Sequence, residues 1–144
     1  MIYKAQKSDA TIVSALAAKV WTSASVEDLI EEFNEFLISE DSATYLYIIN
    51  NKAIGFAQCQ LRHDYVEGTE TSPVGYLEGV YIEPEHRNQG YGKALVRACE
   101  NWAKKMGCTE FASDCELHNT DSLAFHLHSG FTEANRIICF TKKL

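Results

Sequence analysis

Hydrophobic positions recur with two different periods along this chain, and the changes of period divide it into predicted helices and strands. Apolar side chains recur at helical spacing after Ser8 and again after Ser25, which is typical of amphipathic helices. We expect Ser8 to cap a first helix that runs to about Val20. Serine suits the N-cap at both starts, and Asp28 completes a capping-box pattern with Ser25.

Short runs of β-branched and aromatic residues predict the strands of the first half. Ile2–Ala5 is a candidate edge strand. Thr44–Ile49 and Ile54–Arg62 are longer strands on either side of Asn50-Asn51-Lys52, a turn composition that favours a hairpin. The polar segment His63–Pro73 is long for a hairpin connection, so we interpret it as a functional loop.

The most informative stretch contains a predicted strand, a turn with glycines and a helix. Tyr76–Ile82 is apolar enough for a buried strand, and Pro84 ends it because proline lacks an N–H donor. A helical period then starts at Tyr91. The turn Arg87–Gly92 therefore precedes a helix N-terminus, where glycines let a ligand approach the backbone and free N–H groups bind anions.

The predicted elements of the last third are short. Thr109–Asp114 reads as a strand, and a helix over Ser122–His128 begins near Asn119. Phe131–Ala134 and Ile137–Lys142 predict a terminal β-hairpin that closes the sheet.

Charge and composition restrict the class of partner. The chain has 144 residues and a formal net charge of −7, from 13 Lys and Arg against 20 Asp and Glu. This charge disfavours nucleic acid, whereas it would attract a polycationic small molecule. There is no signal-peptide pattern and no apolar run of the ~20 residues that cross a bilayer, so we expect a cytoplasmic protein without membrane contact.

The five cysteines include no Cys-x-x-Cys pair. We interpret most of them as small buried apolar groups in a reducing compartment, with metal or redox work as the alternative. The histidines show no ligand spacing, so no metal is expected.

The turn after the central strand does not match two common phosphate-binding motifs. A Walker A loop needs Ser or Thr after Gly-Lys, but Ala94 follows Lys93, and a dinucleotide fingerprint needs glycine where Leu95 stands. An ordinary crossover turn is one remaining interpretation. The other interpretation rests on the pattern Arg-x-x-Gly-x-Gly after the strand. Together with Ala124–Phe131 (Ala-Phe-His-Leu-His-Ser-Gly-Phe), this pattern resembles the GCN5-related N-acetyltransferases, the GNAT family. Members of this family bind acetyl-CoA.

The resemblance covers nearly the whole chain and implies a single GNAT domain over residues 1–144. The implied fold is α/β (α+β), with a mixed central sheet of about six to seven strands and about four helices. In this family the central strand and the next strand splay apart around the thioester. Glycine inside a strand often marks a bulge, so Gly79 is expected to free a backbone N–H for the thioester carbonyl.

Acetyl-CoA is the co-substrate that this resemblance implies. The central strand would line its pantetheine arm, and the turn would hold its pyrophosphate. The expected cofactor-binding residues are Val80, Tyr81, Ile82, Arg87, Asn88, Gln89, Gly90, Tyr91, Gly92, Lys93 and Asn119.

Further segments resemble the aminoglycoside 6′-N-acetyltransferases of the chromosomal Acinetobacter type. These are Tyr65–Tyr81, Cys108–Asp114 and the closing Phe-Thr-Lys-Lys. The resemblance implies acetyl transfer to the 6′-amine of aminoglycoside antibiotics, resistance to them, and a homodimer. Carboxylates and aromatic faces suit such a polycation. The acceptor-binding residues carried over by position are Trp21, Tyr65, Glu78, Asp114, Asn119 and Asn135, the last standing where the group has an acid.

The expected reaction is direct attack of a neutral amine on the thioester in a ternary complex. Glu78 or Asp114 would accept the ammonium proton, directly or through water, or Glu78 would only hold the sugar. Many family members have a tyrosine at the position of His126, which we interpret either as the acid that protonates the thiolate or as a packed histidine. For Trp21, too, there is an alternative interpretation, as a side chain that packs in the hydrophobic core.

Two other functions stay open. The first is an acetyltransferase for a polyamine or a protein amine. The second is a non-catalytic CoA-binding module, against which Glu78, Asp114 and Asn119 argue, since cofactor binding alone needs none of them.

Overall fold

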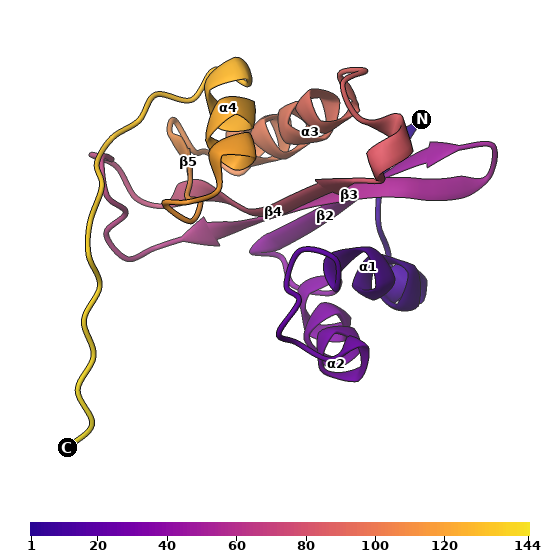
Figure 1. The fold of residues 1–144 in the computed structure, drawn as a ribbon, viewed down its shortest axis with the longest axis horizontal. Coiled ribbons are helices and arrows are strands. Elements are labelled where there is room, and N and C mark those ends of the chain that lie inside the picture. The colour runs from indigo at the N-terminus through magenta and orange to yellow at the C-terminus, as the bar shows by residue number, and fades with distance from the viewer.

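The computed structural model describes residues 1–144 and contains one five-stranded sheet with helices on both faces (Figure 1). The strands lie in chain order in the sheet and are antiparallel, except that β4 and β5 are parallel. The strands are β1 (Ile2–Lys4), β2 (Ser42–Ile49), β3 (Lys52–Arg62), β4 (Val74–Ile82) and β5 (Phe111–Ser113). The α-helices are α1 (Ala10–Ala17), α2 (Val26–Phe36), α3 (Tyr91–Lys105) and α4 (Thr120–His128). Short 3-10 turns span Lys7–Asp9 and Pro84–His86.

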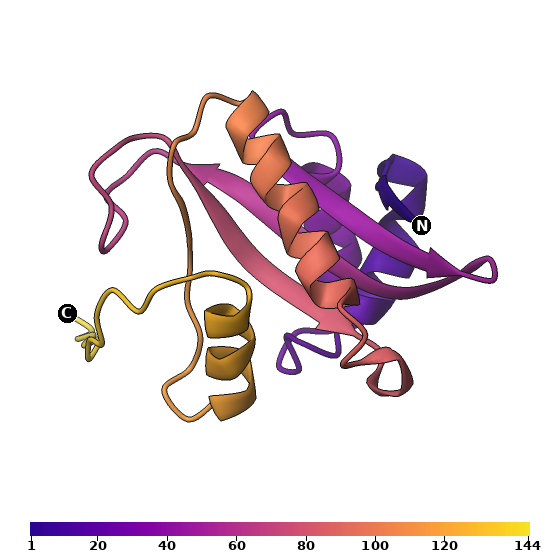
Figure 2. The same cartoon turned by 90° about the horizontal axis from the view of Figure 1, so that it is seen from above.

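The helices divide the hydrophobic core into two layers (Figures 1 and 2). Helices α1 and α2 cover one face of the sheet, where Phe33, Leu46 and Phe56 are almost fully buried. Helix α3 crosses the other face and buries Leu95 and Trp102 against it. None of the helices combines the length and hydropathy that crossing a bilayer requires. No group of three or more His, Cys, Asp and Glu side chains could hold a metal ion.

Local sequence signals locate several element boundaries. Asn50 and Asn51 have φ of 49° and 61°, as a tight β2–β3 hairpin turn needs. The Ser25 hydroxyl accepts the Asp28 N–H at 3.1 Å and caps α2. The predicted helix cap at Ser8 is wrong, because Ser8 lies within the 3-10 turn and Asp9 is the residue that precedes α1. The Asp9 carboxylate accepts the Gln6 N–H at 2.8 Å and holds this turn. The helix also ends earlier than predicted, at Ala17.

Strand β4 contains the bulge expected near Gly79. Gln58 on β3 is paired with Gly79 and Cys59 with Leu77, so Glu78 is an extra residue without a partner. A Cβ atom on Gly79 would lie 2.8 Å from the Trp21 ring, so glycine is needed for this ring to rest on the strand. The bulge thus presents Glu78 and Gly79 to the same face of the sheet.

Strands β4 and β5 separate soon after they meet. They are paired only from Gly75 to Leu77 on β4, opposite Phe111 to Ser113 on β5. Beyond Leu77, the side of β4 that faces β5 has no partner strand, so the backbone groups that point to this side are not paired with another strand. The β5 strand is also shorter than the predicted Thr109–Asp114.

The predicted terminal hairpin is wrong. Residues 131–144 contain no helix or strand, so the sheet has five strands instead of six to seven. The segment first passes the 65–69 loop, where the Asn135 amide donates to Glu67, and its end then extends away from the domain (Figure 1). Ile137, Ile138 and Phe140 are 66%, 80% and 87% exposed. A run of consecutive apolar residues suits a strand that is buried on both faces. Within one copy of the chain, no helix or strand covers either face of this segment.

Three of the five cysteines, Cys59, Cys99 and Cys108, are buried as free thiols, in agreement with their interpretation as core residues. Cys115 and Cys139 are free and exposed instead. Cys139 is exposed because it belongs to the unpaired C-terminal segment.

Candidate active site

Three polar side chains of β3 and β4 lie on the same face of the sheet as α1 and α2: Gln58, Gln60 and Glu78. Trp21, Gln58 and Glu78 line a cavity of about 350 Å³ there, which we call the small cavity. Gln58 is only 2% exposed and its side-chain Nε2 has no hydrogen-bond partner. A buried donor without a partner is costly, so Gln58 is an unusual polar residue in the wall of the small cavity.

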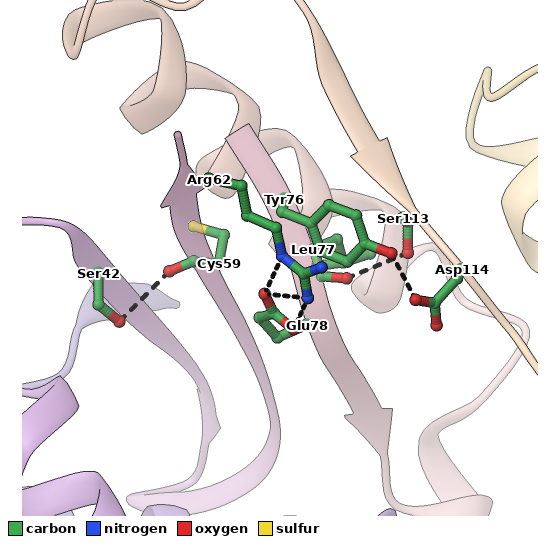
Figure 3. Close-up of polar contacts among 8 residues, drawn as sticks. All are labelled: Ser42, Cys59, Arg62, Tyr76, Leu77, Glu78, Ser113 and Asp114. Atoms are coloured by element: carbon green, nitrogen blue, oxygen red, sulfur yellow. Dashed lines mark hydrogen bonds and ion pairs between the residues drawn. The ribbon is translucent and has the colours of Figure 1, made fainter. Parts of the chain in front are cut away.

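The Glu78 carboxylate is already paired with a cation that the sequence pattern did not indicate. Arg62 Nη2 donates to both carboxylate oxygens at 2.9 Å and Arg62 Nε donates to one of them at 3.0 Å (Figure 3). The guanidinium carbon lies 3.6 Å from the centre of the Tyr76 ring. Such a fork on a carboxylate, combined with an aromatic face, forms a cation site.

Tyr76 connects this ion pair to the second predicted acid. Its hydroxyl donates a hydrogen bond to the Asp114 carboxylate (Figure 3). Burial raises the pKa of the Tyr76 hydroxyl above its usual range, and the hydrogen bond to Asp114 raises it further. Tyr76 is therefore a neutral donor at physiological pH, and Asp114 is oriented by it.

A second cavity of about 760 Å³, the large cavity, lies between the 65–69 loop, β5, α4 and the C-terminal segment. Tyr65, Asp114, His126 and Asn135 all line it. Tyr65 is 75% exposed, and the Asn135 amide donates to Glu67 at 3.0 Å. The exposure of the Tyr65 ring leaves it available for stacking.

His126 lies at the point where β4 and β5 separate. The Ser113 hydroxyl is 3.1 Å from the Leu77 carbonyl oxygen (Figure 3), and His126 Nε2 is 2.8 Å from the same hydroxyl. His126 Nδ1 is 2.7 Å from the Ser122 carbonyl oxygen, so Nδ1 carries a proton. The single Ser113 hydroxyl proton is donated either to the Leu77 oxygen or, when the ring is neutral, to Nε2. In the imidazolium, Nε2 donates to the hydroxyl and the hydroxyl donates to Leu77, which makes this pair suitable for moving a proton.

The structure does not bring Asn119 to either cavity. Its side-chain oxygen accepts the Ser122 N–H at 3.0 Å and caps α4. Sequence reasoning missed Gln58, Arg62, Tyr76 and Ser113 as site residues. For Gln58 a signal was present, because it interrupts the apolar run Ala53–Cys59 in the way that Glu78 interrupts β4.

The turn before α3 presents unpaired backbone groups. Arg87 Nε donates to the Ile82 carbonyl oxygen at 2.8 Å and ties the turn to the end of β4. Asn88 and Gly90 have φ of 61° and 84°. The Ala94 N–H to Gly90 oxygen bond (3.0 Å) is the first of the helix, so the N–H groups of residues 91–93 have no partner within it. This arrangement is suited to an anion such as a pyrophosphate.

The end of β4 that leads into this turn directs its side chains to both layers. Val80 and Ile82 pack against the core under α3. Tyr81 packs against the core under α1 and α2, and its hydroxyl donates to Glu83 at 3.1 Å. The side chains are occupied in packing, so a ligand in the gap between β4 and β5 would meet the β4 backbone.

Comparison with known proteins places the chain among acetyltransferases. The model of the acetyltransferase (GNAT) family matches residues 6–131. The aminoglycoside N(6′)-acetyltransferase type 1 of Acinetobacter haemolyticus is 40% identical, over 90% of this chain and 88% of the relative.

Solved structures of related enzymes superpose over the whole chain. Aminoglycoside N-acetyltransferase AAC(6′)-Iy in complex with CoA has a TM-score of 0.96 at 33% identity and covers 100% of this chain, and this chain covers 95% of it. The same enzyme with the bisubstrate analogue CoA-S-monomethyl-acetylneamine has a TM-score of 0.95 at 33% identity, with 100% and 98% coverage. By sequence and fold, the chain belongs to the acetyltransferase (GNAT) family.

Proposed function

We propose that this acetyltransferase is an aminoglycoside 6′-N-acetyltransferase, which moves the acetyl group of acetyl-CoA to the 6′-amine of an aminoglycoside antibiotic and so confers resistance. The observation that carries the proposal is the position of Glu78. This carboxylate follows the last residue of β4 that is paired with β5, and it lines the small cavity with Trp21. An ammonium held there would lie beside the gap between the two strands.

The relatives support this choice of acceptor. The Acinetobacter haemolyticus relative is named for the 6′ activity, and the analogue bound to AAC(6′)-Iy joins CoA to an acetylneamine. The clustering of Tyr65, Asp114 and Asn135 around the large cavity adds further groups for a polyamino sugar.

The cofactor proposal assigns the pyrophosphate to the turn from Arg87 to Lys93 and the pantetheine arm to the open edge of β4. Free N–H groups at the start of α3 would hold the pyrophosphate. Val80 and Ile82 would contribute backbone groups along the arm, because alternate residues of a strand point to the same edge and the Tyr81 carbonyl faces β3. Bound acetyl-CoA supplies an activated thioester, and the bulged part of β4, next to the end of its pairing with β5, would provide a backbone N–H for the thioester carbonyl oxygen.

In the proposed mechanism Glu78 accepts the ammonium proton, directly or through water, because it lies beside the gap in which the thioester is placed. Asp114 then orients the acceptor together with Tyr76. After the amine attacks, the departing thiolate needs a proton. His126, linked through Ser113 to the end of the β4–β5 pairing, is positioned to supply it.

We further propose that the protein is a cytoplasmic homodimer. The buried free thiols suit a reducing compartment. The C-terminal segment exposes Ile137, Ile138 and Phe140 to solvent, and a second copy is the natural cover for them. Asn135 belongs to the same segment and lines the large cavity, so the partner chain would border the acceptor site.

The function is tested by free-thiol release from acetyl-CoA with kanamycin, tobramycin, spermidine and a lysine peptide in parallel. We expect release with kanamycin and tobramycin only, and none with an aminoglycoside that carries a 6′-hydroxyl. Release only with spermidine or the peptide would replace aminoglycosides by another amine. A complete absence of release would identify a CoA-binding module.

The cofactor turn is tested by Gly90→Val, with Gly107→Val as the matched control. Both glycines have positive φ, 84° and 90°, and a Cβ atom added to either one would meet no other atom within 4 Å. Each valine is therefore strained by about 1–3 kcal/mol. Only Gly90→Val is expected to weaken acetyl-CoA binding, by at least about tenfold in calorimetry. Equal affinity in both variants would refute the assignment of the turn.

The acid role of His126 is tested by His126→Phe against His128→Phe on the same helix. We expect His126→Phe to lower kcat by about 100-fold, because the thiolate would leave without a positioned proton donor. His128 bonds only to the backbone oxygen of Ala124 at 2.7 Å, so its variant should keep full turnover. Full turnover in His126→Phe would leave this histidine a packing role.

The dimer is tested by deleting residues 137–144 and measuring mass by light scattering during gel filtration. The full chain is expected at twice the monomer mass and the shortened chain at the monomer mass. The variant Lys143→Gln, which changes the same segment without removing an apolar side chain, serves as the control and should remain dimeric. A monomeric full chain at micromolar concentration would contradict the proposal.

A further inference from the structure

Resting on the proposed function, we propose that Arg62 is a resident counter-cation, which fills the cation subsite between Glu78 and Tyr76 in the free protein and is displaced by an ammonium group of the acceptor. Arg62 would then decide which acceptors enter, because only a cation can replace it.

Arg62 makes the contacts that an acceptor ammonium needs. It uses both oxygens of Glu78 and lies on the face of Tyr76. An ammonium is attracted by the same carboxylate and the same ring. The two cations therefore compete for one place.

The Arg62–Glu78 ion pair lies at the boundary between the two cavities. The Arg62 side chain lines the large cavity, whereas Glu78 lines the small one. The pair thus separates Trp21 in the small cavity from Tyr65 and Asp114 in the large one. A polyamino sugar that contacts all of these groups must have the Arg62–Glu78 pair opened.

The unpaired Gln58 Nε2 is buried in the wall of the small cavity, which Glu78 also lines. Its missing partner is an acceptor atom, and a hydroxyl of a sugar is of that kind. Gln58 and Glu78 thus form a polar part of the wall of the small cavity, and a ligand bound there meets the Arg62–Glu78 pair.

Displacement of Arg62 is physically inexpensive. Its side chain is 44% exposed against 17% for Glu78, so the arginine regains water while the carboxylate receives the incoming ammonium. The large cavity, which Arg62 already lines, also contains Glu67 and Asp114. The displaced guanidinium thus remains near negative charge, and Glu78 is never left without a counter-ion.

A neutral sugar gains nothing from this exchange. It would have to separate Arg62 from Glu78 without replacing the charge, which leaves a half-buried carboxylate unpaired. The subsite therefore selects polycationic acceptors by a repulsive element as well as an attractive one.

The test measures kanamycin binding by calorimetry with CoA present, so that no turnover occurs. Without the resident cation, Arg62→Gln should bind kanamycin about fivefold more tightly, the equivalent of about 1 kcal/mol for a partly exposed ion pair. Arg97→Gln removes the same charge from an exposed position on α3 and should leave the affinity unchanged. The double variant Glu78→Gln/Arg62→Gln should bind kanamycin no more tightly than Glu78→Gln alone, because the carboxylate that holds Arg62 is absent from both.

The inference would be overturned if Arg62→Gln bound kanamycin as tightly as the wild type or less tightly. This holds for a variant that keeps the wild-type affinity for CoA and the wild-type melting temperature. If that variant does not fold, Arg62→Lys replaces it. Lysine lacks the fork geometry, so it should bind kanamycin about twofold more tightly, and weaker or equal binding would overturn the inference as well. If the wild-type protein neither bound nor acetylated kanamycin, the proposed function would be contradicted. If the wild type acetylated kanamycin but Arg62→Gln did not bind it more tightly, only the role of Arg62 would be contradicted.

Discussion

The additional residue in β4 controls the geometry of the whole site. Regular alternation would send Glu78 and Gly79 to opposite faces of the sheet, but the register shift leaves Glu78 unpaired and directs both residues toward Trp21. The carboxylate is thereby placed on the cavity face without a break in the strand. The neighbouring Gly79 leaves space for the Trp21 ring. One bulge therefore positions both the Glu78 carboxylate and the Trp21 ring in the small cavity.

The same region of β4 ends the pairing with β5. Gly75 to Leu77 are paired, and the strands diverge from the bulge onward. Ser113 and His126 bond across the last paired position, which closes the gap at its base. Backbone groups that would ordinarily be consumed by a neighbouring strand are thus kept available up to the turn at Arg87–Gly92, where the helix N-terminus adds further unpaired donors.

Electrostatics in this protein act at two ranges. The net charge of −7 favours approach of any polycation. At contact distance, Glu78 is paired with Arg62 and Asp114 accepts from Tyr76, so neither acid is left without a partner. The proposed exchange of one cation for another lets a partly buried carboxylate serve as a binding group and still be compatible with a stable fold.

Features that depend on neighbours along the chain could be predicted from the amino-acid sequence. The Asn50-Asn51 turn, the Ser25 cap, the helix after Gly90 and the glycine in β4 are local signals, because each reflects backbone conformations that few residue types adopt. Contacts between distant residues are visible only in the folded chain: Arg62 pairs with Glu78, and Ser113 joins His126 to Leu77. The apolar C-terminal segment forms no strand for a related reason. Its pattern says which residues favour burial, whereas only the three-dimensional arrangement shows that one copy has no surface to bury them.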